Sequence, residues 1–196
     1  DGTLTGKSGY GIAIDGSPAL VKSQLTAKEK LLVTGLGAAP SVGTWTPGMS
    51  NYVQSMIDAF RPYADITFNN YGKSYTGTLG DWKTSNYLVT YSHGSLKISG
   101  GSTGAGVLLV EGDLEISGGW DYAGYVFVTG RVRFVGGGKG TRLRGVMFVG
   151  GDVIQPTPSL LDAMLSGTVD IAFSSEALRR VRAGVGQYHV SAITEP

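Results

Sequence analysis

The second half of the chain repeats one pattern of apolar and polar positions. Residues 94–111 read GSLKISGGSTGAGVLLVE and residues 112–129 read GDLEISGGWDYAGYVFVT, and nine of the eighteen aligned positions are identical. A third copy begins at Gly130 with three extra residues, and a fourth opens as GDVI at Gly151. Because each copy is too short to contain a helical crossover, the repeat predicts a mainly β fold. That fold is a parallel β-solenoid, or right-handed β-helix, with one coil of about 18–21 residues per copy.

Each copy contains two kinds of strand. The first alternates apolar and polar residues, as in DLEI at 113–116, and therefore predicts a strand with one buried face. The second is apolar at every position, which is typical of strands covered on both sides. These apolar runs are residues 107–110, 125–128 and 146–149. The glycine pairs Gly100-Gly101 and Gly118-Gly119 indicate stacked corners where φ is positive.

A helix over about residues 50–61 is the candidate cover for the apolar strands. Ser50 can cap its start, and Pro62 follows its end. Four apolar residues fall at the i, i+3, i+4, i+7 spacing of one helical face. They are Val53, Met56, Ile57 and Phe60. We expect this helix to pack across the outer face of the sheet.

The pattern as a whole predicts a single domain over residues 1–196. Residues 1–85 form a mixed N-terminal region, and residues 86–173 form the solenoid coils. Within the N-terminal region, residues 22–32 are ambiguous between a short helix and a strand. The aromatic-rich stretch from 66 to 82 indicates a hairpin or a long loop.

The last part, residues 174–196, predicts a C-terminal helix and tail. Ser175 can cap a short helix that continues to about Arg182, and Gly184 would stop it. We expect this helix to cap the solenoid by protecting its open end, where unpaired strand edges would otherwise face solvent.

Composition supports this architecture and excludes several classes of function. Glycine accounts for 32 residues and charged residues for only 16%, which suits tightly turned sheets, while 41% hydrophobic residues exclude a disordered chain. A net charge of +1 excludes nucleic-acid binding by the molecule as a whole. The absence of cysteine excludes disulfides and thiolate metal sites. No run approaches the roughly 20 apolar residues that span a bilayer.

Stacking the copies in register places charged residues in columns of alternating sign. The first column is Ser95, Asp113, Arg131 and Asp152, and the second is Lys97, Glu115, Arg133 and Ile154. An inward column of Leu96, Leu114, Val132 and Val153 lies between them. We interpret these charges as a structural ladder, because opposite charges on neighbouring strands favour one register and oppose a slip.

A basic stretch, RVRFVGGGKGTRLRG at residues 131–145, carries five cations and no acid. Its first two arginines belong to the ladder. The other three cations, Lys139, Arg142 and Arg144, are predicted to lie in the enlarged turn of the third copy without ladder acids. They are therefore the candidate contacts for DNA phosphates.

Several aromatic residues could either form a binding surface or pack inside the protein. Trp120 and Tyr122 replace small residues of the preceding copy, and with Tyr125 they could form a contact surface for a sugar, a base or a protein. The alternative is that they pack beneath an adjoining loop. Trp45, Tyr71, Tyr75 and Trp82 pose the same ambiguity.

No constellation for catalysis or metal binding is evident in the sequence. Glu111, with two ladder acids, could be read as a calcium site or as part of the acid pair of a polysaccharide-cleaving β-helix, but the ladder accounts for those two acids without either. His93 and His189 are far apart, no nucleophile motif accompanies them, and we expect them to have packing or surface roles. We expect no cofactor and no metal.

The later copies resemble the C-terminal region of PilX-type pilus assembly proteins, which are membrane-anchored and associated with type IV pili. The resemblance rests on GVLLVEGDLEISGGWDYAGYVFVTGRVRF, RLRGVMFVGGDV and GTVDIAFSSEALRRV, and it covers about residues 94–182. It implies an extracellular or envelope location, pilus or envelope proteins as partners, and membrane attachment only through an N-terminal helix missing from this chain.

Together these observations predict a non-enzymatic structural or adhesive protein that acts through protein–protein or surface contacts. Self-association through the solenoid ends is a further expectation, because uncapped ends offer unpaired backbone groups. Two alternatives stay open. One is a DNA-binding module for DNA uptake, like some minor pilins, and the other is a carbohydrate-binding or carbohydrate-cleaving β-helix.

Overall fold

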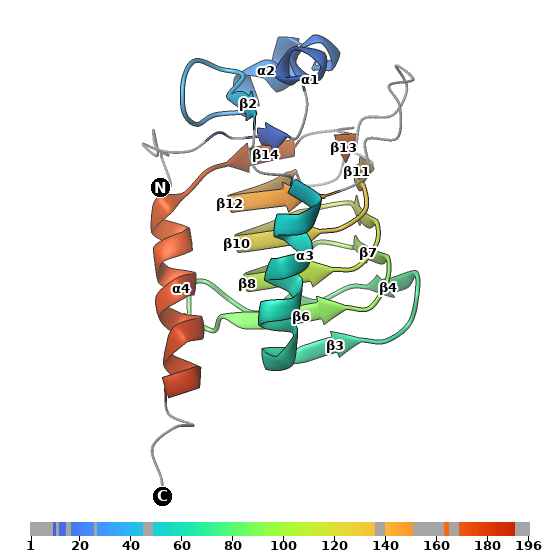
Figure 1. Cartoon of the computed structure of the whole chain (residues 1–196), viewed down its shortest axis with the longest axis vertical. Helices are drawn as coiled ribbons and strands as arrows, with labels where there is room; N and C mark the ends of the chain where they lie inside the picture. The colour runs from blue at the N-terminus through green and yellow to red at the C-terminus, as the bar shows by residue number, and fades with distance from the viewer. Residues whose placement is uncertain are drawn as a thin grey trace, which may run out of the picture.

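The computed structural model describes residues 10, 12–14, 17–25, 27–44, 49–135, 140–150, 163–164 and 169–190. Its body is a stack of parallel strands, with two long helices along one side and a small N-terminal unit at one end (Figure 1). The chain therefore forms the predicted mainly β, parallel β-solenoid with accompanying helices.

Two parallel sheets form the solenoid. The larger has the strand order β14-β12-β10-β8-β6-β3, with β5 also beside β8, and the smaller has the order β13-β11-β9-β7-β4. The strands of the larger sheet are β3 (Ile66–Phe68), β5 (Thr78–Leu79), β6 (Leu88–Ser92), β8 (Ser102–Val110), β10 (Trp120–Val128), β12 (Thr141–Val149) and β14 (Val169–Ala172). Those of the smaller sheet are β4 (Lys73–Tyr75), β7 (Leu96–Ser99), β9 (Leu114–Ser117), β11 (Val132–Val135) and β13 (Ala163–Met164).

A column of glycines divides each long strand of the larger sheet into two halves. Gly124 pairs with Gly106 and with Gly145, which lie 18 and 21 positions away, so the predicted coil lengths are confirmed. All three have positive φ, between 133° and 147°. A Cβ on any of them would overlap the carbonyl oxygen of the strand beneath. Only glycine permits this conformation at this close approach.

The apolar second halves of the long strands are covered on both sides, as their composition predicts. Leu108 and Val126 point into the solenoid interior, and both are fully buried. The alternate residues Val107 and Phe127 belong to a second core on the outer side, which the helices complete. The solenoid therefore has one core inside its coils and another beneath its helices.

The predicted central helix is confirmed as α3 (Met49–Phe60), and the 3-10 turn η1 (Arg61–Tyr63) follows it. It packs across β8, β10 and β12. Its apolar stripe faces the sheet, because Val53 and Ile57 are fully buried and Met56 and Phe60 are partly buried.

The C-terminal helix α4 (Ser175–Val190) is longer than predicted and lies elsewhere. It runs beside the stack and packs on β8, β10 and β12, so it covers a sheet face and not the open end (Figure 1). Gly184 does not stop it. A Cβ at Gly184 would overlap the ring of Tyr87, so this glycine lets the helix approach the sheet closely.

The solenoid begins earlier than predicted, because residues 66–82 form no hairpin or structureless loop. Strands β3, β4 and β5 pair in parallel with β6, β7 and β8 and add a coil below the recognisable repeat. Its side chains Ile66, Phe68 and Tyr75 pack against the interior core. The shortness of these strands hid the two-residue period. The described strands leave the outer edges of β3 and β4 without a partner.

The other end of the stack is covered by the N-terminal unit. It contains β1 (Ile12–Ile14), α1 (Pro18–Gln24), α2 (Ala27–Leu32) and β2 (Val42–Thr44). The described part of the ambiguous stretch 22–32 is thus helical except at Leu25, which follows the end of α1. Helix α2 packs on β14, and Thr34 forms a parallel bridge to Ala172. This unit, and not α4, protects an open end.

The last coil also differs from the prediction. Strand β11 pairs with β13, so Val132 lies beside Ala163 and Arg133 beside Met164. The GDVI segment that was expected to supply this strand, including Asp152, Val153 and Ile154, lies outside the described residues. The repeat motif therefore does not mark the strand that continues the sheet.

Candidate functional site

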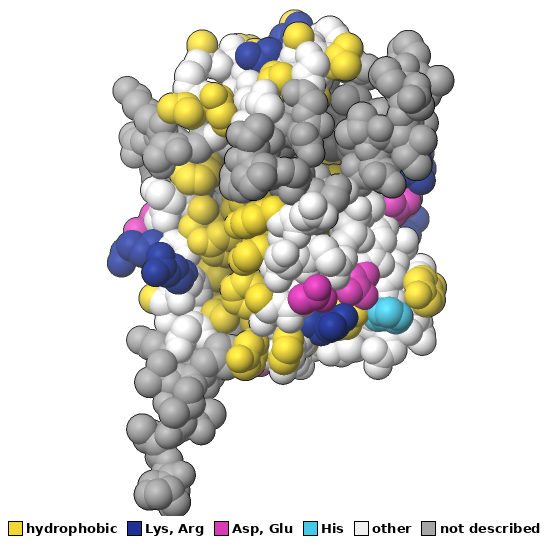
Figure 2. All heavy atoms as spheres, viewed as in Figure 1, with side chains coloured by type: hydrophobic (Ala, Val, Ile, Leu, Met, Phe, Trp, Pro, Cys, Tyr) yellow, Lys and Arg dark blue, Asp and Glu magenta, His cyan; other side chains and the backbone are white. Residues whose placement is uncertain are grey.

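An apolar groove lies between α3 and α4. It has a volume of about 430 Å³, and the outer face of β8 and β10 forms its floor. Its lining residues are Tyr52, Met56, Phe60, Val107, Tyr125, Phe127, Val181, Arg182, Val185 and Gly186. Figure 2 shows the hydrophobic side chains gathered in a continuous strip between the arginines of α4 and the opposite wall. We call this feature the α3–α4 groove.

The groove is lined by residues at regular spacings, alternate residues on the strands and residues about one turn apart on the helices. Outward residues of the apolar strand halves supply the floor, where the rings of Tyr125 and Phe127 stack with centroids 6.2 Å apart. From α3, Tyr52 leans over the floor, with its ring centroid 5.2 Å from that of Phe148. From α4, Val181 and Val185 are one helical turn apart and both are buried.

The groove is almost free of charge, and its one lining cation is at the rim. Arg182 of α4 is exposed and lines the groove. Burial raises the pKa of the Tyr125 hydroxyl, and the nearby positive charge of Arg182 partly opposes that rise. Burial alone raises the pKa of Tyr52. Both hydroxyls therefore stay neutral donors at physiological pH.

The outer side of α4 is basic. It carries Arg179, Arg180 and Arg182 and a single acid, Glu176, which pairs with Arg179 at 2.9 Å and with Arg180 at 2.7 Å. Three cations against one acid leave the exposed side of α4, beside the groove, with a net positive charge. An apolar surface beside positive charge favours a partner that is apolar on one stripe and acidic along its edge.

A polar cluster lies where β6 and β8 end, beside η1. Glu111 accepts hydrogen bonds from the Tyr91 hydroxyl at 2.6 Å and from His93 Nδ1 at 2.9 Å, and its other oxygen is 3.4 Å from the guanidinium of Arg61. His93 Nε2 is 3.4 Å from the hydroxyl of Tyr71. We call this arrangement the Glu111 cluster.

Opposing effects set the pKa of Glu111. Burial raises it, but hydrogen bonds from Tyr91, His93 and Gln54 and the charge of Arg61 lower it more, so its pKa is below the ordinary value. An ionised Glu111 ties the strand ends to η1. From the sequence, we considered Glu111 and His93 separately, although they are 18 positions apart and the predicted coil length places them side by side. We expected a packing or surface role for His93. Its side chain is half exposed and hydrogen-bonded, which agrees with that expectation.

The structure confirms the predicted charge ladder where it is described. Arg131 is 3.2 Å from Asp113, whose carboxylate also accepts the backbone N–H of Arg131 at 2.8 Å. Lys97 is 2.6 Å from Glu115, and Arg133 is 3.9 Å from the same carboxylate.

The prediction that Arg142 and Arg144 lie in an enlarged turn without neighbouring acids is wrong. Arg142 and Arg144 lie on strand β12, and Lys139 lies outside the described residues. Arg144 pairs with Asp121 at 2.5 Å. Arg142 stands in register between Asp121 and Asp170. These two arginines thus continue the alternation of charge on a second sheet. The acids are Asp121 on β10 and Asp170 on β14, which the alignment of the repeats had not placed beside them.

The predicted aromatic surface is also corrected. Trp120 and Tyr122 are 1% and 0% exposed and stack on each other inside the solenoid, with centroids 5.0 Å apart. Burial raises the pKa of Tyr122 far above its ordinary value. These two residues are therefore packed, as the alternative held, but they lie in the core inside the coils and not beneath an adjoining loop. Only Tyr125 reaches a surface, and that surface is the α3–α4 groove.

Two searches for other kinds of site were negative within their scope. Among the described residues, no three or more His, Asp or Glu side chains are grouped so as to hold a metal ion. None of the described helices has both the length and the hydropathy needed to cross a membrane.

The fold and groove define a class of protein, a parallel β-solenoid with a helix-walled apolar groove. No protein-family model matches the chain, and no match was found among curated proteins or solved structures. The resemblance of residues 94–182 to PilX-type proteins is therefore a hypothesis.

Proposed function

We propose that this chain is a non-enzymatic structural or adhesive protein of the bacterial cell surface or envelope, associated with type IV pili, that acts through protein–protein contacts. The observation that supports it most directly is the α3–α4 groove. Its lining is apolar apart from Arg182 at the rim, and its floor is a sheet of parallel strands. The pilus setting rests on the resemblance of residues 94–182 to PilX-type proteins.

The occupant that fits the groove is an amphipathic helix of a pilus or envelope protein. Both walls are helices that follow the stack, and α3 and α4 are about 18 and 24 Å long. A third helix laid between them would bury its apolar stripe on Tyr125 and Phe127 and complete a helical layer over the sheet. The basic α4 wall selects a helix with acidic residues beside that stripe.

Site-specific photo-crosslinking in the host tests this function. A photoreactive residue in place of Met56 lies in the groove, and one in place of Lys97 lies on the opposite sheet as the matched control. We expect crosslinks to an acidic helix of a pilus or envelope protein from position 56 and none from position 97. Arg182→Glu should abolish the crosslink, whereas Arg182→Lys should retain it.

A phenotype completes the test. Arg182→Glu and Met56→Glu should impair pilus assembly, adhesion or motility in proportion to the lost crosslink. Unchanged assembly, adhesion and motility after deletion of the whole protein would refute the pilus role. Equal crosslinking from positions 56 and 97 would refute the groove as the contact surface.

A further inference from the structure

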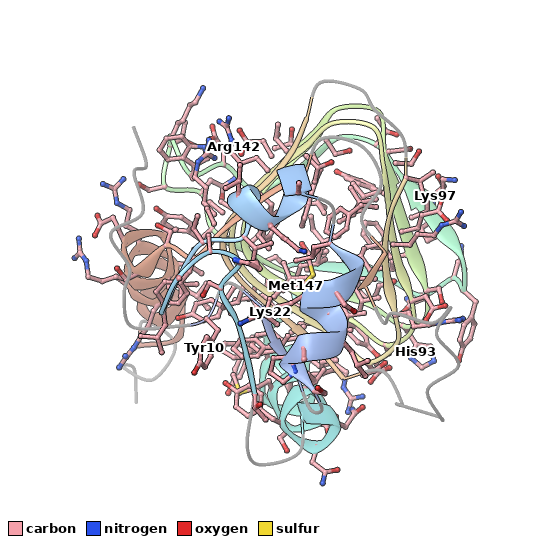
Figure 3. All side chains as sticks on the ribbon, turned by 90° about the horizontal axis from the view of Figure 1, so that it is seen from above. Tyr10, Lys22, His93, Lys97, Arg142 and Met147 are labelled. Atoms are coloured by element: carbon pink, nitrogen blue, oxygen red, sulfur yellow. The ribbon has the colours of Figure 1, made fainter. Side chains whose placement is uncertain are left out.

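A second pocket lies on another side of the solenoid and has different chemistry. It has a volume of about 240 Å³ and lies on the outer side of the first halves of β8 and β10. Seen along the stack, Arg142, which extends from this side, is well separated from Lys97 and His93 (Figure 3). The residues that matter here are Thr78, Asp81, Trp82, Lys83, Thr103 and Asp121, and we call this feature the Trp82 pocket.

The loop that supplies Trp82 is held firmly against the sheet. Asp81 and Asn86 form an antiparallel bridge, with backbone hydrogen bonds of 2.7 and 2.9 Å. Gly80 has a φ of 85°, and a Cβ there would overlap the backbone carbonyl of Ala105. The Asp81 carboxylate accepts the backbone N–H of Lys83 at 2.9 Å. The pocket wall is therefore formed before any ligand arrives.

The indole ring and a carboxylate are oriented together. The guanidinium of Arg144 lies 5.2 Å from the ring centroid of Trp82 and binds Asp121 at 2.5 Å. Arg144 therefore positions both a stacking surface and a hydrogen-bond acceptor. This role also explains why Arg144 is mostly buried, with 20% of its side chain exposed.

We infer that the Trp82 pocket binds a neutral sugar ring. The volume is below the roughly 300 Å³ of pockets for drug-sized ligands and suits a single pyranose. A flat ring wall fits the C–H face of a sugar. The pocket offers both acceptors (the carboxylates) and donors (the Lys83 ammonium), and the threonine hydroxyls can do either. This mixture fits a sugar, because each of its hydroxyls can donate and accept a hydrogen bond.

Charge balance separates a sugar from the other polar ligands. The pocket is lined by two carboxylates, Asp81 and Asp121, and by the cation of Lys83, and the charge of Asp121 is also paired with that of Arg144 behind the lining. A phosphate would meet two carboxylates, and a cation would meet two basic groups. The pairing leaves acceptor capacity, because each carboxylate has about four lone-pair sites and the protein contacts occupy about two. This inference does not depend on the function of the groove.

Ligand-observed NMR and tryptophan fluorescence titration test the inference on the intact chain. The probes are glucose, galactose, mannose and N-acetylglucosamine, with glucose 6-phosphate as the charged comparison. We expect at least one neutral sugar to bind and to do so at least tenfold more tightly than the phosphate. Trp82→Ala and Asp121→Asn should each weaken binding tenfold or more, Trp82→Phe should keep most of it, and Lys97→Ala on the opposite sheet should change nothing.

Three results would overturn the inference. They are no binding by any neutral sugar, preference for the phosphate, and binding unchanged by Trp82→Ala. If Trp82→Ala fails to fold by circular dichroism, the exposed variant Lys83→Met takes its place, and its affinity must also fall. Because the crosslinking from position 56 and the sugar titration report different sides of the solenoid, either proposal can fail alone.

Discussion

The two halves of each long strand, before and after the glycine column, share an interior and differ in their outer face. Before the column, outward residues are charged: Arg142 is exposed, Asp121 is partly exposed, and Arg144 is mostly buried. After it, Val107 and Phe127 are buried beneath α3 and α4. One backbone thus carries both a solvent-facing and a helix-covered sheet. The outward residues determine which half is covered by helices. Apolar outward side chains are stabilised by burial under a helix, whereas burial of charged ones would cost free energy.

The largest effect should come from the glycine column itself. Gly124→Ala forces a Cβ against the Gly106 carbonyl at a φ of 144°, and we expect a loss of about 3–5 kcal/mol in unfolding free energy. Gly101→Ala is the matched control. It also has positive φ, 75°, but nothing lies within 4 Å of its Cβ, so the cost should be about 1–2 kcal/mol. Urea denaturation followed by circular dichroism measures both, and equal losses would contradict a packing role for the column.

The next effect concerns the helix that covers the second halves. Ile57→Ala removes a fully buried side chain of α3 and should cost about 2–4 kcal/mol. Met56→Ala, one residue earlier, removes a partly exposed groove residue and should cost about 1 kcal/mol or less. The same denaturation experiment compares them. A larger loss at Met56 would mean that the groove is a closed part of the core.

A smaller and pH-dependent effect is expected where the second half of β8 ends. Because the pKa of Glu111 is lowered in the folded protein, its ionised form stabilises the fold above its unfolded pKa. That stabilisation is lost as the pH falls through the folded pKa. Glu111→Gln should lower stability at pH 7 by about 1 kcal/mol and flatten the acid-side decline. Thermal melts from pH 7 to 3 measure this, and parallel curves for the two proteins would exclude the ionised carboxylate as the cause.

The smallest effect should come from the exposed charge ladder. Arg131→Asp places an acid beside Asp113 and should cost about 0.2–1 kcal/mol, less at high salt. The double variant Asp113→Arg with Arg131→Asp restores opposite charges and should recover most of the loss. Denaturation at low and high salt checks this prediction. The double variant also removes the acceptor of the hydrogen bond from the backbone N–H of residue 131, so no recovery would show that the loss of this bond outweighs the restored charge pair.

Much of the fold could be predicted because, in a repeat of constant length, the spacing along the chain also gives the pairing between strands of neighbouring copies. Identical spacing in consecutive copies implies the register that pairs Leu96 with Leu114 and Lys97 with Glu115, and both pairs are observed. The helix α3 was predictable from its own four-residue stripe. The coil formed by β3, β4 and β5 was missed because its strands are two or three residues long and share little sequence with the later copies.

The candidate sites were harder to predict than the fold. The α3–α4 groove joins residues near positions 56, 125 and 185, and no local pattern links α4 to α3. The Trp82 pocket needs a loop from before the repeat to fold back over strands within it. For Trp120 the sequence left a contact surface and a packed position open, and the inward direction of its side chain in β10 decided for packing.

Taken by itself, the sequence determined the parallel coil, its length, the alternating charges and the helix that covers the sheet. Each of these depends on periodicity, which every copy repeats. Only the tertiary structure decided that α4 lies along the sheet, that the N-terminal unit covers one end, and that Arg61 meets Glu111. Those choices depend on which surfaces fit, such as Gly184 against Tyr87, and the fit exists only once the coils are stacked.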